Sequence, residues 1–172
     1  MMADTERPPV AQMGVDSRHR GREVALQMLY QWEVGRVPID EVCRTFWTGG
    51  PAGTPPAESV RSFATLLATG VATHAGELDP LIAEAAEHWR VERMNVMDRL
   101  ILRLGVYEFL HEPETPSKVV INEALELGRT FSADESVRFI NGILDAVRRT
   151  LSREWAPRNP IRSSSAGQIS TH

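Results

Sequence analysis

The sequence has one cysteine, one lysine and no long uninterrupted apolar run, and each scarcity excludes a class of protein. A single cysteine, Cys43, cannot form an internal disulfide. No segment approaches the roughly 18–20 uncharged apolar residues of a membrane-spanning helix. The first residues also lack the basic region and apolar stretch of a secretory signal. We therefore expect a cytoplasmic protein with no membrane segment.

Catalytic signatures are also lacking. The sequence contains no HExxH metal motif, no nucleophile elbow, no phosphate-binding loop and no dinucleotide-binding glycine pattern. The histidines are scattered along the chain, and none stands beside a cysteine at metal-ligand spacing; they are His19, His74, His88, His111 and His172. We therefore expect a protein that is not an enzyme and has no cofactor and no metal site.

Length and composition favour one domain between polar tails. The 172 residues are 42% apolar, which is enough for one core. Residues 1–16 and 155–172 are rich in proline, serine, glycine and polar residues, so we expect flexible tails there. Residues 17–154 are then a single helical domain that carries the binding function.

Within that domain, apolar residues recur at helical spacing and nowhere alternate with the period of a strand. The pattern predicts an all-α, compact seven-helix bundle. Its expected helices cover residues 18–35, 39–47, 57–75, 79–89, 94–111, 117–131 and 132–151. Asp79-Pro80 is typical of a helix start, and Ser132 with Glu135 fits a capping box for the last helix.

The helix expected at 94–111 is apolar nearly all round, which predicts a buried central helix. Its one polar strip holds Asp98, Arg99 and Arg103.

The formal net charge is −4, so any attraction to nucleic acid must come from a local basic patch. Arg18, His19, Arg20 and Arg22 form such a cluster where the first helix begins. Cations are disfavoured at a helix N-terminus, so a basic cluster at this place indicates that its charge serves a partner. A phosphate backbone is such a partner. A solvated basic run paired with Glu23 and other acidic neighbours explains the cluster equally well.

Three aromatic residues lie away from the expected core stripes. Tyr30 falls on the same side of the first helix as His19, while Phe131 and Phe139 flank the capping box. Single-stranded RNA is bound by aromatic stacking combined with arginine contacts, so these rings are candidate base-stacking residues. The alternatives stay open: Tyr30 packs at the core edge, and Phe139 packs against Ile143.

Four stretches together resemble the NusB antitermination family. They are RGREVALQMLYQW at 20–32, RLILRLGVYE at 99–108, KVVINEALELGRTF at 118–131 and FINGILD at 139–145. The similarity extends over about residues 17–151, nearly the whole expected domain.

The resemblance implies a seven-helix fold and binding to the boxA element of nascent ribosomal RNA transcripts. It also implies a heterodimer with NusE, a ribosomal small-subunit protein, within an RNA polymerase complex that contains other Nus factors. Because the similar NusB proteins include both monomers and dimers, the resemblance also allows a homodimer.

The resemblance further implies roles for individual residues. The arginine-rich RNA-binding motif matches Arg18, His19, Arg20 and Arg22, although His19 and Gly21 interrupt it here. The positions that match aromatic residues near the RNA surface of the family are Tyr30, Phe131 and Phe139. The positions that match its partner-binding or RNA-proximal surfaces are Asp98, Arg103 and Glu135.

The sequence is also compatible with two other functions. One is a protein-binding helical scaffold, or a homodimer, without strong intrinsic RNA affinity. The other is an accessory domain of an RNA methyltransferase, because NusB-like domains precede the catalytic domain in some of those enzymes. No dinucleotide-binding domain follows Leu151, so we expect no methyltransferase activity from this chain.

Overall fold

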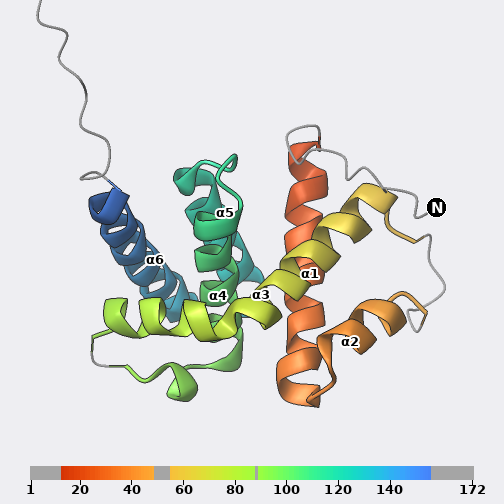
Figure 1. Cartoon of the computed structure of the whole chain (residues 1–172), viewed down its shortest axis with the longest axis horizontal. Helices are drawn as coiled ribbons and strands as arrows, with labels where there is room; N and C mark the ends of the chain where they lie inside the picture. The colour runs from red at the N-terminus through yellow and green to blue at the C-terminus, as the bar shows by residue number, and fades with distance from the viewer. Residues whose placement is uncertain (1–12, 49–54, 88, 156–172) are drawn as a thin grey trace, which may run out of the picture.

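The computed structural model describes residues 13–48, 55–87 and 89–155, and this part of the chain contains helices and no strand (Figure 1). The helices are α1 (Val15–Gly35), α2 (Ile39–Thr45), α3 (Glu58–Ala85), the short 3-10 helix η2 (Val91–Arg93), α4 (Val96–His111), α5 (Ser117–Phe131) and α6 (Asp134–Trp155). The all-α prediction is confirmed. Most of the predicted tails lie outside the described residues.

The predicted number of seven helices is wrong for the described residues, which form six α-helices and one 3-10 helix. The segments expected as two helices at 57–75 and 79–89 form the single helix α3, with Pro80 inside it. Proline removes only one helical hydrogen bond, and Leu78 and Ile82 on either side are fully buried. Their burial keeps the helix continuous, although α3 changes direction along its length (Figure 1).

The prediction of a buried central helix is confirmed for α4. Leu100, Ile101 and Leu102 have no exposed surface. The helix packs against α1, α3, α5 and α6, so it crosses the middle of the molecule. Asn95 caps its N-terminus by accepting a hydrogen bond from the Met97 amide at 2.9 Å.

The expected capping box at the start of α6 is wrong. The helix begins at Asp134, and the Ser132 hydroxyl donates to the buried Asp98 carboxylate on α4 instead of capping α6. The Ser136 hydroxyl donates to the other Asp98 oxygen at 2.8 Å. Ser132 directly follows α5 and stands two positions before the first residue of α6, so it does not occupy the N-cap position of that helix.

Helices α1 and α4 run antiparallel, and this fixes where the candidate sites lie. Arg22 near the start of α1 contacts Glu108 near the end of α4, whereas Glu33 near the end of α1 contacts Arg99 near the start of α4. None of the described helices combines the length and hydropathy of a membrane span.

Candidate nucleic-acid interface

The basic cluster lies on the first two turns of α1, but its four side chains differ in accessibility. Arg20 is the most exposed, with 56% of its side-chain surface accessible, and His19 keeps 33%. Arg18 is half-buried and its side chain makes no ion pair or hydrogen bond with the described residues. Arg22 is only 3% exposed. The cluster therefore offers two arginines to a partner rather than three.

Arg22 is held inside the protein by Glu108. Its Nε donates to Glu108 Oε1 at 2.7 Å and its Nη2 to Oε2 at 2.9 Å. Its guanidinium also lies 5.5 Å from the centre of the Phe63 ring. Burial alone would lower the pKa of Arg22, but the hydrogen bonds and charge of Glu108 raise it. Arg22 cannot meet a phosphate without breaking this pair.

His19 bridges two carboxylates. Its Nδ1 lies 2.6 Å from Glu123 Oε2 on α5, and its Nε2 lies 3.0 Å from Glu23 Oε1 on α1. The hydrogen bond with Glu123 raises the pKa of His19, although partial burial opposes it. Arg20 also pairs with Glu23, at 2.9 Å. Two acidic residues thus offset much of the positive charge that the sequence places here.

Tyr30 is 45% exposed near the other end of α1. It lies eleven residues after His19, which corresponds to almost the same helix face, about 16 Å further along the axis. His19 contacts α5, so Tyr30 lies on the side of α1 that faces α5. This exposure leaves part of the ring accessible, and it is also compatible with packing at the core edge with the hydroxyl in water.

Phe131 and Phe139 lie at the corner where α5 meets α6, and both are half-buried against the core. The Phe139 ring also meets Trp89, at 5.8 Å between centroids and an angle of 71°. Trp89 is 61% exposed and is the most accessible aromatic ring of the described residues for which exposure is given. Trp89 was not among the residues predicted from the sequence. The signal for it was an aromatic residue directly before an arginine, Arg90, at the end of a helix.

Asp98 and Glu135 lie at the same corner with opposite surroundings. Asp98 is 7% exposed and holds Ser132 and Ser136, so it ties the corner to α4. Glu135 is exposed in the first turn of α6. Of the two, only Glu135 is accessible to a partner.

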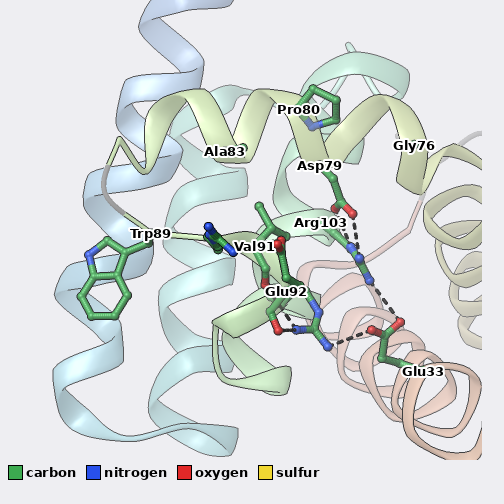
Figure 2. Close-up of a pocket in the computed structure, with 11 residues that line it drawn as sticks. Glu33, Gly76, Asp79, Pro80, Ala83, Trp89, Val91, Glu92 and Arg103 are labelled. Carbon is green, nitrogen blue, oxygen red and sulfur yellow. Dashed lines mark hydrogen bonds and ion pairs between the residues drawn. The ribbon is translucent and has the colours of Figure 1, made fainter.

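Arg103 is 7% exposed and lies in an ion-pair network beside a pocket of about 550 Å³. Figure 2 shows Asp79 of α3 and Glu33 of α1 reaching its guanidinium from two sides. Asp79 accepts two hydrogen bonds, at 2.7 and 2.8 Å, and Glu33 accepts one at 3.2 Å. Burial would lower the pKa of Arg103, but Asp79 and Glu33 raise it. The network joins α1, α3 and α4.

The residues predicted to bind RNA therefore occupy two areas. Arg18, His19 and Arg20 lie at the start of α1, beside the end of α4. The corner of Phe131 and Phe139 lies beside Asp98 at the start of α4, about 15 Å away along that helix. Tyr30, on the α5 side of α1, lies toward the second area. An elongated partner is needed to contact both.

Comparison with known proteins gives the chain a family. The NusB family model matches residues 19–149. The transcription antitermination protein NusB of Koribacter versatilis is 49% identical over 138 residues, covering 80% of this chain and 92% of the relative. The protein of the same name from Solibacter usitatus is 43% identical over 149 residues, covering 87% and 99%.

Solved structures show the same fold. T. maritima NusB is 28% identical, with a TM-score of 0.69 over 77% of this chain and 90% of that chain. A crystal structure of antitermination factors NusB and NusE in complex with dsRNA includes a chain that is 20% identical, with a TM-score of 0.69 over 80% and 99%. The named relatives are antitermination factors, which confirms the expectation of a non-enzymatic protein. By family model, sequence identity and fold, this chain belongs to the NusB family.

Proposed function

We propose that this protein is a transcription antitermination factor that binds boxA of nascent ribosomal RNA together with NusE. Family membership and the fold shared with a NusB–NusE–dsRNA complex support this function. The observation that carries it is the exposed Tyr30, which lies on the same face of α1 as His19 and beyond the accessible cations Arg18 and Arg20. Single-stranded RNA is bound by aromatic rings that stack on bases together with arginines that contact the backbone.

In this proposal Arg18 and Arg20 contact phosphates and Tyr30 stacks on a base. The half-buried rings of Phe131 and Phe139 contact the RNA further along, at the α5–α6 corner. His19 adds positive charge when protonated. Arg22 acts differently: its buried pair with Glu108 positions the first turns of α1, so its effect on RNA binding is indirect.

We extend the proposal to the partners. Glu135 is exposed at the α5–α6 corner and is available to NusE or to another protein. Asp98 is buried and supports that surface from inside, whereas the buried Arg103 joins α4 to Asp79 of α3 and Glu33 of α1. The complex acts in the cytoplasm with RNA polymerase and other Nus factors, and helps the polymerase avoid premature termination.

A titration of labelled boxA RNA tests the function, with and without NusE, against a scrambled RNA of equal length. We expect preferential binding to boxA that NusE strengthens and salt weakens. Replacing Arg18 and Arg20 with alanine should lower the slope of log affinity against log salt by about 0.7 per lost phosphate contact. Tyr30→Ala should cost about 1–3 kcal/mol if one base stacks on the ring.

Arg149→Ala is the matched control, because Arg149 is an exposed arginine on α6 that pairs with Asp145 at 3.2 Å. It should leave boxA binding unchanged. Equal binding of boxA and scrambled RNA, with or without NusE, would remove the proposed function. Formation of a NusE complex or a homodimer without RNA affinity would favour the scaffold instead, and light scattering distinguishes the two.

A further inference from the structure

A cluster of two histidines and a glutamate joins α3 to α4. It consists of His74 and Glu77 on α3 and His111 at the last position of α4. One ligand atom from each residue lies within 4.8 Å of the other two. We propose that these three side chains bind a divalent transition-metal ion such as Zn²⁺.

The donor set fits zinc chemically. Zinc sites with three protein ligands use histidine nitrogens and carboxylate oxygens at about 2.0–2.2 Å, and leave a further position to water. Tetrahedral ligands at such distances lie somewhat more than 3 Å apart, so the cluster must contract slightly around the ion. The Glu77 side chain can move toward the ion, because 51% of its surface is exposed. Its Oε2 already lies 3.6 Å from His111 Nε2.

The orientation of His74 is fixed by a hydrogen bond that metal ligands commonly make. Its Nδ1 lies 2.8 Å from the Gly70 carbonyl oxygen one turn earlier in α3. A carbonyl only accepts, so Nδ1 carries the proton and Nε2 keeps the lone pair that binds a metal. Such a bond from the non-ligating nitrogen holds the ring and raises its basicity.

His111 is held by the ring of Tyr107, one turn earlier on α4. The two rings stack at 4.8 Å between centroids and 25° between planes. The His74 ring lies 4.4 Å from that of His111. His111 also ends α4, where the backbone carbonyls carry partial negative charge that favours a cation. Orientation and electrostatics therefore agree on a cation at this point.

Sequence spacing could not reveal this site. His74 and Glu77 are three residues apart on one helix, but His111 is 34 positions further on, so no local motif exists. The expectation of no metal site came from motifs within one element. The packing of α3 against α4 brings the third ligand into place.

Cobalt titration of the full, metal-free chain tests the proposal, because Co²⁺ replaces Zn²⁺ and absorbs visible light when its coordination is four- or five-fold. We expect a saturable spectrum at one Co²⁺ per chain, which Zn²⁺ abolishes by displacement. A melting temperature that rises with Zn²⁺ should accompany it, because an ion that binds only the folded state stabilises that state.

His111→Ala and Glu77→Gln should each weaken Co²⁺ binding at least 10-fold and remove most of the spectrum. Glu84→Gln, at an exposed glutamate two turns beyond Glu77 on α3, should change neither. Circular dichroism of each metal-free variant checks that the fold persists. Absence of a saturable spectrum, or a spectrum retained in both ligand variants, would overturn the proposal.

Discussion

Arg22 of α1 and Glu108 of α4 form a buried bidentate ion pair, with 3% and 2% of their side-chain surfaces exposed. They lie 86 positions apart in the sequence. A third charge, Glu123 Oε2, lies 3.7 Å from Arg22 Nη1. The pair joins the helix that carries the basic cluster to the central helix, so the candidate interface depends on an ion pair that is buried.

Breaking this pair on one side should destabilise the protein. Arg22→Ala or Glu108→Ala leaves one buried charge without a partner, which costs about 3–5 kcal/mol. Replacing both residues with leucine removes both charges and should restore most of the lost stability. Urea unfolding of the two single variants and the double variant measures the three values.

Arg20→Ala is the control, because the exposed pair of Arg20 with Glu23 should contribute only about 0–1 kcal/mol. The interpretation of Arg22 as a positioning residue predicts that Arg22→Ala weakens RNA binding by unfolding the protein. A well-folded Arg22→Ala with normal unfolding energy and lost RNA affinity would contradict that interpretation.

Gly70 leaves room for Tyr107. A Cβ added at Gly70 would lie 2.2 Å from the Tyr107 ring and 2.3 Å from its hydroxyl, and the ring is only 6% exposed. Gly70→Ala should therefore cost about 1–3 kcal/mol through overpacking. Gly76→Ala, in the same helix with nothing within 4 Å, should instead stabilise by about 0.4–1 kcal/mol. Thermal unfolding of the two variants should show shifts of opposite sign.

Most of the fold could be predicted from the sequence, because it follows from periodicity. The apolar residues at helical spacing in α4 and α5 predicted the central helix and the helix that follows it. Pro80 misled the prediction, because a rule about local backbone geometry was overridden by tertiary packing of Leu78 and Ile82. The local capping pattern at Ser132 also misled the prediction, because Ser132 ends α5, its hydroxyl donates to the buried Asp98, and α6 begins only at Asp134.

The site was less predictable than the fold. Sequence placed Arg22 beside Arg18 and Arg20 in one basic cluster, but helical geometry turns Arg22 inward and burial pairs it with Glu108. Tyr30 was predicted off the core stripe, and its 45% exposure agrees. Trp89 gave only a weak signal, since its contact with Phe139 comes from a chain segment 50 positions away.

His19 should make stability depend on pH. Its pKa is raised in the folded protein, chiefly by Glu123, so protonation favours folding. The contribution is fully present below the unfolded pKa of about 6.5 and is lost as pH rises through the folded value. NMR titration of the His19 ring should give a pKa above 6.5, and unfolding energy should fall across the same interval relative to His19→Gln.

Glu123→Gln removes the largest cause and should bring the His19 pKa back toward its ordinary value. Glu126→Gln, an exposed glutamate on the same helix, should leave it unchanged. If the two variants gave the same His19 pKa, the bridge to α5 would not be its source.

Asp98→Ala should loosen the α5–α6 corner. It leaves the hydroxyls of Ser132 and Ser136 without their acceptor in a partly buried place, at a cost of about 1–3 kcal/mol. Amide hydrogen exchange should accelerate in the first turn of α6 and the last turn of α5, whereas exchange at the start of α1 should stay unchanged. Glu135→Gln, at an exposed position of the same corner, should alter unfolding energy by less than about 0.5 kcal/mol.

Because Glu135 is accessible and Asp98 is not, weakened NusE binding in Glu135→Gln at normal stability would mark a direct contact. Weakened binding in Asp98→Ala should instead scale with the loss of order at the corner, and a loss of NusE affinity without faster exchange there would contradict the supporting role of Asp98.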